Sequence, residues 1–274
     1  MTSNKFLLIN ADDLGASRSV NQSIARACRE GILRSASLMA GGAAFEEAAA
    51  MAKELPLSAG IHITLCDGRP VLKPSEIPGL VDKQGFFEQD PARAGINYWL
   101  RRKRLSGQLE AEIEAQFRKL EDAGLKPLHA DSHHHLHVHP VIFRILCRVA
   151  ARHGVKWIRI PPGPFAASFA LAGSTGIPEW AVFRALRVFN LRHARAAGLQ
   201  TACTYGISRP GQVSADYLIR LISRIDGPVA EIFAHPDLSG PGKTELEALI
   251  SPAVREIALD RGFTITGFED IGKK

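Results

Sequence analysis

Histidine is concentrated in one short stretch in the middle of the chain. Six of the thirteen residues from 129 to 141 are histidines, and Asp131 stands among them. Neutral imidazole is the commonest nitrogen ligand for transition metals, and carboxylates often share its sites. The stretch is too irregular and too far inside the chain to be an affinity tag. It therefore indicates a metal site, against the plainer interpretation of a polar loop with incidental histidines.

Further acids and imidazoles stand at the carboxyl ends of predicted strands. Asp12 and Asp13 come directly after an apolar run, His62 lies inside another, and His235 follows a third. His133 is the first residue able to turn inward after the short strand that opens the histidine stretch. In a barrel of parallel strands these ends meet on one face, where such folds build their active sites. Convergence from four separate strands is hard to attribute to coincidence.

The residue types suggest how the roles divide. Adjacent carboxylates at a strand end diverge, so one of Asp12 and Asp13 can bind a metal while the other acts as a general base. The plainer alternatives are a helix cap for an aspartate, a satisfied core residue for His62 and a loop residue for His235. As a functional group, His235 would donate a proton to a leaving amine. Arg159, flanked by isoleucines, requires a carboxylate partner if it faces inward, and we expect that partner to be Asp12.

Short apolar runs alternate with longer helical patterns along the chain. Strands are predicted at residues 6–10, 35–39, 59–65, 128–130, 155–160, 203–206, 229–233 and 263–266. Helices are predicted at residues 19–30, 45–55, 108–123, 140–152, 214–225 and 245–261. Such alternation implies a parallel sheet with crossover helices. We therefore expect an α/β fold, an irregular TIM-barrel-like (β/α) barrel, as a single domain over residues 1–274.

Two stretches break this alternation. Residues 66–105 carry several prolines and glycines, and residues 161–191 are rich in large apolar side chains, including Phe169 and Phe183. Loops of this length in a compact domain are often functional. The second stretch is open to two interpretations, a helical insert packed on the barrel wall or a lid or groove that faces a substrate.

The composition is that of an ordinary folded protein, with 274 residues, 46% hydrophobic residues and a net charge of +6. The densest basic run, residues 101–104, follows Tyr98 and Trp99. It is open to interpretation as a solvated face or as a contact with a lipid surface or phosphate. Because the other positive charges are spread along the chain, no nucleic-acid partner is expected.

Cysteines and apolar segments bear on the compartment. The four cysteines are far apart and form no C-x-x-C pair, so neither a cysteine zinc site nor a disulfide framework is expected. The first apolar run is too short for a signal peptide, and no run is long enough for a transmembrane helix. We expect a cytoplasmic enzyme, with peripheral contact at a membrane surface and homo-oligomerisation left open.

Four motifs, taken together, resemble the YdjC-like carbohydrate deacetylase family. The resemblance runs in order from about residue 5 to residue 271 and is carried by Asn10-Ala-Asp-Asp-Leu-Gly15, Gly60-Ile-His-Ile-Thr-Leu65, Asp131-Ser-His-His-His-Leu-His137 and Ala234-His-Pro236. It implies a (β/α) barrel and chemistry similar to that of the polysaccharide deacetylases. The implied reaction is metal-dependent removal of acetyl groups from N-acetylglucosamine units.

The resemblance also implies roles for individual residues. It makes Asp13, His62 and His133 the ligands of one divalent metal ion, with zinc, magnesium, cobalt and manganese not distinguished. It makes Asp12 the general base and His235 the general acid. The wider superfamily often draws two ligands from an H-x-x-x-H motif, which His133 and His137 would satisfy here. His137 therefore competes with His62 for the third ligand position.

Within the family, the chain is most similar to the hopanoid-biosynthesis-associated (HpnK-like) branch. The similar segments are Asp67–Leu72, Ile77–Asp82, Gln108–Phe117 and Glu231–Pro236. The implied substrate is an N-acetylglucosaminyl hopanoid, an amphipathic lipid that would suit the apolar 161–191 stretch and the basic run. The segment Asp131-Ser-His-His-His135 is closer to the chitooligosaccharide deacetylases, which keeps an oligosaccharide substrate as an alternative. A metal-dependent phosphoesterase and an inactive metal-binding barrel are further alternatives.

Overall fold

The computed structural model describes residues 5–161, 177–206 and 212–271. Within these ranges, parallel strands form one curled sheet in the order β5-β4-β3-β2-β1-β7-β6, and β8 pairs with β1. A parallel bridge between Trp157 and Gln200, just before β6, draws the two ends of the sheet together. The predicted α/β, irregular barrel-like fold is thus confirmed. The strands are β1 (Lys5–Leu14), β2 (Ser35–Leu38), β3 (Ser58–Ile63), β4 (His129–Ser132), β5 (Trp157–Ile158), β6 (Cys203–Tyr205), β7 (Val229–Ala234) and β8 (Phe263–Thr266).

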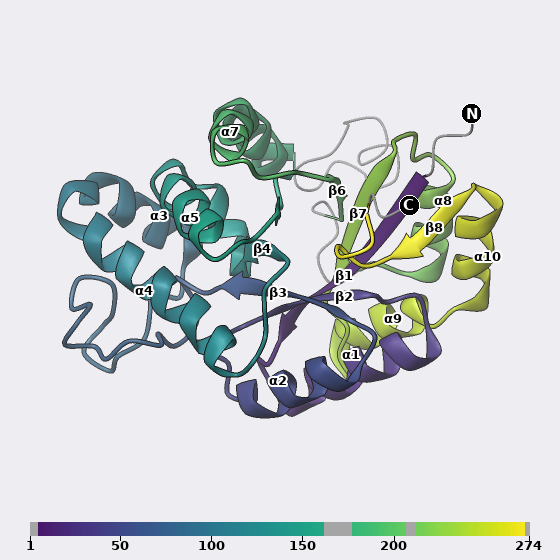
Figure 1. Ribbon diagram of the computed structural model, residues 1–274, viewed down its shortest axis with the longest axis horizontal. Coiled ribbons are helices and arrows are strands. Elements are labelled where there is room, and N and C mark those ends of the chain that lie inside the picture. Colours follow the sequence, from purple (N-terminus) through teal and green to yellow (C-terminus); the bar gives the residue numbers. More distant parts are fainter. Residues whose placement is uncertain (1–4, 162–176, 207–211, 272–274) are drawn as a thin grey trace.

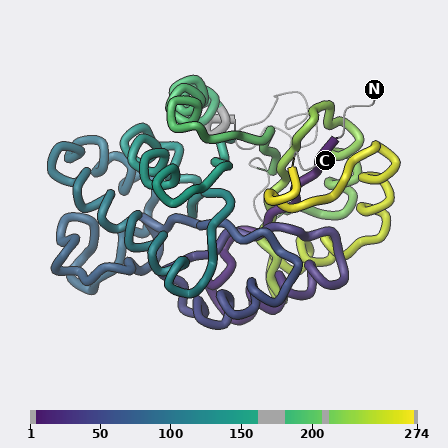
Figure 2. The backbone as a smooth tube through the Cα atoms, viewed as in Figure 1, coloured from purple at the N-terminus to yellow at the C-terminus, as the bar shows by residue number. Residues whose placement is uncertain are grey.

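Helices surround the sheet (Figure 1). The tube in Figure 2 shows the first two helices side by side below the strands, with α4 and α5 together on one flank and α8 and α10 on the other. They are α1 (Arg18–Glu30), α2 (Phe45–Glu54), α3 (Pro91–Leu100), α4 (Arg102–Asp122), α5 (Pro140–Arg152), α7 (Ile177–Ala196), α8 (Ala215–Ile222), α9 (Gly240–Leu249) and α10 (Pro252–Asp260), with the 3-10 segment η1 (His133–Val138).

The strands read as nearly continuous apolar runs because they are covered on both faces. Leu7, Leu8 and Ile9, which alternate between the two faces of β1, are all fully buried. Parallel sheets with helices outside them show this pattern rather than a strict alternation. The polar residues among the strands therefore stand out as features that must be satisfied by partners.

Several predicted elements differ from the observed ones. The first strand runs on to Leu14 and so contains Asp12 and Asp13, and α4 begins at Arg102 rather than at residue 108. The predicted helix over residues 245–261 is two helices, because proline at 252 cannot continue the hydrogen-bonding of a helix and pushes Ser251 into an extended conformation (φ −67°, ψ 124°). The predicted strand over residues 155–160 is reduced to Trp157–Ile158, so Arg159 lies directly after β5.

The 66–105 stretch is tied to α4 by two buried side chains. The Glu112 carboxylate accepts the backbone N–H groups of Val71 and Leu72 at 2.8 and 3.0 Å. The Gln116 amide bonds both the N–H and the C=O of Thr64, at 2.9 and 2.7 Å. These bonds satisfy backbone groups that a sheet ladder would otherwise pair. The stretch then ends in α3 and the first turn of α4.

The 161–191 stretch is described only in part. Residues 162–176, with Phe165, Phe169 and Leu171, lie outside the described residues, as does the side chain of Trp180. From residue 177 the chain forms α7, which lies beside α5 (Figure 1), and Asn190 donates a hydrogen bond to the Val138 carbonyl at 3.1 Å. The described part is therefore helical, and its side chains also line the cavity described below. Among the described helices, none combines the length and apolar character needed to cross a membrane.

Candidate metal and catalytic site

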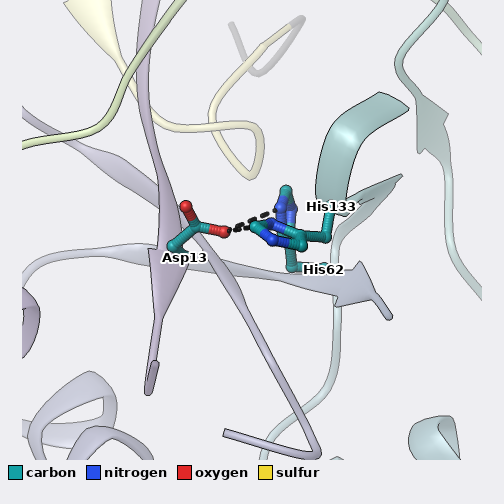
Figure 3. A group of neighbouring side chains, drawn as sticks. All are labelled: Asp13, His62 and His133. Carbon is teal, nitrogen blue, oxygen red and sulfur yellow. Dashed lines mark hydrogen bonds and ion pairs between the residues drawn. The ribbon is translucent and has the colours of Figure 1, made fainter. Parts of the chain in front are cut away.

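The structure brings Asp13, His62 and His133 together at the carboxyl end of the sheet. The Asp13 Oδ1 atom lies 2.8 Å from His133 Nδ1 and 3.2 Å from His62 Nε2 (Figure 3). One ligand atom from each residue lies within 4.8 Å of the other two. One carboxylate and two imidazoles, drawn from β1, β3 and η1, thus converge on a single point.

Backbone geometry at the end of β1 separates the two aspartates. The pairing of β1 with β2 shifts register between Ala11 and Leu14, and Asp13 has a φ of 63°. Register irregularities of this kind re-aim side chains, and a left-handed aspartate is uncommon enough to indicate a local constraint. Asp12 is buried in the barrel interior, while Asp13 reaches the two histidines.

Sheet register places a carboxylate behind His62. His62 and Asp131 are direct partners across β3 and β4, and His62 Nδ1 lies 2.7 Å from Asp131 Oδ1. A carboxylate on one ring nitrogen fixes the ring so that the other, here Nε2 facing Asp13, can serve as a metal ligand.

Electrostatics at this point favour a cation. Burial lowers the pKa of His62, but Asp131 and the hydrogen bond to Asp13 outweigh burial and raise it to about 10. Burial would raise the pKa of Asp13, yet the hydrogen bonds with His133 and His62 hold it well below its usual value. The negative surroundings that hold a proton on His62 would equally hold a metal ion.

The histidine stretch turns sharply after β4. His134 and His135 both have a φ of 53°, a left-handed conformation that is costly for residues other than glycine. The turn places His133 on Asp13 and His134 on Asp67, with 3.1 Å between His134 Nε2 and Asp67 Oδ2. His135 lines the cavity described below, and its Nδ1 has no hydrogen-bond partner among the residues that the structure describes. Consecutive strained residues at one place are typical of functional loops.

His137 has both ring nitrogens occupied elsewhere. Its Nδ1 lies 2.8 Å from Ser132 Oγ, and its Nε2 lies 2.9 Å from the Arg159 carbonyl oxygen. Burial outweighs the charge of Asp131 and lowers the pKa of His137 to about 4. His137 therefore supports the turn as a neutral residue, and the geometry favours His62 over His137 beside Asp13.

Arg159 lies at the centre of a buried network of three carboxylates. Its guanidinium bonds the two Asp12 oxygens at 2.6 and 2.8 Å, Asp131 Oδ2 at 2.9 Å and Glu231 Oε1 at 2.8 Å. The Asp12 partner was expected from the sequence, whereas Asp131 and Glu231 were not. Burial would lower the pKa of Arg159, but the carboxylates raise it well above its usual value.

His235 stands at the cavity side of this network. Its Nε2 lies 3.9 Å from Asp12 Oδ2, and its side chain keeps 33% of its surface exposed. The backbone N–H of His235 donates to the buried Glu245 carboxylate, which fixes the turn after β7. An accessible imidazole thus faces a buried carboxylate, the arrangement that a proton donor and a proton acceptor on one substrate require.

A cavity of about 850 Å³ is lined both by acids and histidines of this site and by apolar side chains. The polar part includes Asp12, Asp13, His62, His133 and His235. The apolar part comes from α3, η1, α7 and β7, and includes Ile96, Trp99, Leu136, Val182, Phe183, Leu186 and Phe233.

Within the described part of the chain, two other groups of side chains have ligand atoms close enough to share an ion. One consists of Asp67, His133 and His134 at the exposed rim, and the other of Asp12, His62 and Asp131 in the interior. In the interior group, both carboxylates are already bonded to the Arg159 guanidinium, a cation that would repel a metal ion. The group of Asp13, His62 and His133 is the one that combines an available carboxylate with an oriented imidazole.

Some partners in the site were missed in the sequence. Ser37 donates to Asp131 Oδ2 at 2.7 Å, and Thr204 donates to Glu231 Oε2 at 2.9 Å. A signal for Glu231 existed, because an acid inside the apolar run 229–233 implies a buried cation nearby. For Ser37 there was none, since serine is unremarkable in a strand.

Comparison with known proteins gives consistent matches. The family model described as YdjC-like protein matches residues 6–260. A carbohydrate deacetylase of Geobacillus stearothermophilus is 34% identical over 235 residues, covering 85% of this chain and 79% of that protein. A chitooligosaccharide deacetylase of Salmonella paratyphi B is 30% identical over 283 residues, covering 97% and 99%. A crystal structure from Enterococcus faecalis V583, of a protein provisionally assigned to cellobiose-phosphate cleavage, has a TM-score of 0.74 at 23% identity, covers 98% of this chain and 99% of its own, and shows the same fold.

Proposed function

Because the chain belongs to the YdjC-like protein family, we propose that it is a carbohydrate N-deacetylase that uses one divalent metal ion. The reaction would release acetate and a free amine from an N-acetylglucosamine unit. The observation that carries the proposal is the convergence of Asp13, His62 and His133 beside Asp12 and His235 in one cavity. Metal binding alone would not require the last two residues.

The donor set suits a divalent ion. Asp13 offers a carboxylate with a lowered pKa, and His62 is oriented by Asp131 so that its Nε2 faces Asp13. One carboxylate with two imidazoles is compatible with zinc, cobalt, manganese or magnesium in differing degree. When bound, such an ion would polarise the acetyl carbonyl and make a neighbouring water a better nucleophile.

The protein's own side chains would move the protons. Asp12 is held by Arg159 and by the Asn10 amide at 2.8 Å, and its Oδ2 atom faces His235. Asp12 would take the proton of the attacking water as the C–O bond forms. His235 would give a proton to the amine nitrogen as the C–N bond breaks, so that the products are acetate and an amine.

We further propose a glycolipid substrate of the N-acetylglucosaminyl hopanoid type. Support comes from the apolar part of the cavity lining, which includes Trp99 of α3 and Phe183 of α7. With the sugar held by the acids and histidines of the site, an apolar aglycone could contact these side chains, where burial favours binding. A chitooligosaccharide substrate is the alternative, favoured by the names of the relatives.

The proposal is tested by measuring acetate and new primary amine from an N-acetylglucosaminyl lipid in detergent and from diacetylchitobiose. We expect acetate and amine in equal amounts from both substrates, with a lower KM for the lipid. Deacetylation of diacetylchitobiose alone would refute the glycolipid substrate but not the proposed deacetylase activity. If neither substrate yields acetate while a phosphate monoester is cleaved, the deacetylase proposal fails.

A further inference from the structure

Helix α3 presents a ridge of exposed apolar side chains. Ile96, Trp99 and Leu100 are 61%, 48% and 72% exposed, and their spacing places them on one side of the helix. Val182 of α7 is 58% exposed, and it lines the cavity together with Ile96 and Trp99. The ridge therefore forms one edge of the cavity mouth. Grouped exposure of large apolar side chains marks an interaction site, unlike a single exposed leucine.

A cluster of positive charge adjoins this ridge. Arg101, Arg102, Lys103 and Arg104 follow Leu100 directly, and all four are exposed. Across residues 5–161, 177–206 and 212–271, none of the four makes an ion pair with an acidic side chain, whereas Arg148 and Arg152 of α5 are paired with Glu110. The Arg102 guanidinium lies over the Trp99 ring at 4.9 Å, which joins the charged cluster to the ridge. The cluster is thus left available for a negatively charged partner.

The combination of an apolar ridge with a basic cluster distinguishes between two kinds of negatively charged partner. A polyanion such as a nucleic acid would use the cationic cluster but would leave Ile96 and Leu100 in water. A bilayer with anionic lipids satisfies both parts, because basic side chains contact the phosphates while a tryptophan and aliphatic side chains enter the boundary with the acyl chains. We propose that the α3 ridge and residues 101–104 form a docking surface for an anionic lipid bilayer.

Docking would place the cavity mouth at the bilayer surface. Trp99 and Val182 belong to both the exposed edge and the cavity wall, so an amphipathic molecule could pass from the lipid phase into the cavity while it keeps an apolar environment. This consequence rests on the proposed glycolipid function. The docking itself does not, since it needs only lipid phosphates and acyl chains.

The test is co-sedimentation with phosphatidylcholine vesicles that contain or lack phosphatidylglycerol and carry no acetylated sugar. We expect binding only when phosphatidylglycerol is present, and weaker binding as salt is raised. Arg102→Glu/Lys103→Glu should lower the partition coefficient at least about tenfold, given the usual contribution of each basic residue. Leu100→Ser should lower it by about threefold or more.

Matched controls use positions away from the mouth. Lys126→Glu/Lys156→Glu changes the net charge equally at exposed residues before β4 and β5, at the opposite end of the sheet. Leu259→Ser alters an exposed leucine of α10. Both controls should bind as the wild type does.

Three outcomes would overturn the proposal. The first is no binding to anionic vesicles, and the second is an equal loss of binding in Lys126→Glu/Lys156→Glu and in Arg102→Glu/Lys103→Glu. The third is a wild-type dimer in solution that Leu100→Ser converts to monomer, without any vesicle binding. The last would show that a second copy of the chain covers the ridge. Because the vesicles contain no substrate, these outcomes are separate from any failure of acetate release.

Discussion

Asp12 and Asp13 are adjacent in the chain but have different partners. Asp13 faces His62 and His133, whereas Asp12 is buried against the Arg159 guanidinium. Neighbouring residues of a regular strand point to opposite faces, so the left-handed backbone at Asp13 is what lets both carboxylates line the same cavity. Each aspartate can therefore be tested by itself.

Asp12→Asn should retain metal and lose turnover. The amide keeps the size of the carboxylate but cannot accept the proton of the attacking water, so kcat should fall by about 10²–10⁴. The measurement pairs kcat on diacetylchitobiose with the metal content of the purified variant. A variant that keeps most of its kcat would place the general base elsewhere.

Asp131→Asn should weaken metal binding, although Asp131 is not one of the proposed ligands. The change removes the carboxylate that fixes His62, and loss of such partners typically costs about 10–100-fold in metal affinity. Titration calorimetry on the metal-free protein measures this, with circular dichroism to confirm that the variant folds. Ser37→Ala removes the hydrogen bonds of Ser37 Oγ with Asp131, Asn10 and His129 but keeps the Asp131 carboxylate, so it should have a smaller effect. Unchanged affinity in Asp131→Asn would show that His62 is not a ligand.

Much of this residue-scale arrangement could be predicted because strand order alone brings the carboxyl ends of parallel strands to one face. The pairing of Arg159 with Asp12 also followed, since a buried cation needs a carboxylate. The contact of Asp131 with His62 could not be predicted. It depends on the register between β3 and β4, which is not written in either strand by itself.

At the scale of elements, α7 and α3 supply the apolar walls of the cavity. Phe183 of α7 lines it, whereas Val188 of the same helix is 58% exposed and lies outside its lining. Substitutions at these two positions therefore distinguish a contribution of α7 to substrate binding from a general effect on the stability of the helix.

Phe183→Ser should raise KM for the N-acetylglucosaminyl lipid and leave KM for diacetylchitobiose nearly unchanged. The removed ring contributes about 1.5–3 kcal/mol of apolar burial when the aglycone covers it, which corresponds to roughly a tenfold or larger change in KM. Steady-state kinetics on both substrates measures the difference, and Val188→Ser is the control. Equal changes for the two substrates would mean that α7 has only a structural role.

Element boundaries were less predictable than element types. The helix break at residues 250–251 had a visible signal, because Ser251-Pro252 is a typical start of a new helix. The turn over His134 and His135 had none, since left-handed backbone is normally announced by glycine or asparagine. There the tertiary contacts of His133 and His137 hold a conformation that local preferences oppose.

At the scale of the whole molecule, a network of charged side chains lies inside the barrel, near the carboxyl ends of the strands. Arg159 joins residues of β1, β4 and β7, so the same network that holds Asp12 also links distant strands. His129 of β4 is buried beside this network. Its Nε2 lies 3.0 Å from Ser37 Oγ, and its ring stacks on Phe268 with centroids 4.1 Å apart.

The metal-free protein should lose stability as the pH falls from about 6.5 towards 4. Burial, only partly opposed by Asp131, lowers the pKa of His129 from 6.5 to about 4. In that window the unfolded chain takes up a proton that the folded chain excludes, so the free energy of unfolding decreases by up to roughly 3 kcal/mol for this residue. Above pH 6.5 His129 is neutral in both the folded and the unfolded chain, so it no longer makes the free energy of unfolding depend on pH.

Urea unfolding at pH 7.5 and pH 5 checks this dependence, with His129→Gln as the comparison. The variant is less stable at both values, but its loss between them should be smaller than that of the wild type. If the two proteins lose the same free energy of unfolding, protonation of His129 is not the cause of the loss at low pH.

The most direct test of the account is acetate release from diacetylchitobiose by one preparation before and after chelation, and again after a divalent ion is restored. We expect activity with about one ion per chain, none after chelation, and recovery on restoring the ion. His133→Ala, folded but unable to complete the ligand set, should not recover. Acetate release that continues at the full rate after the ion has been removed would contradict the metal-dependent mechanism at Asp13, His62 and His133.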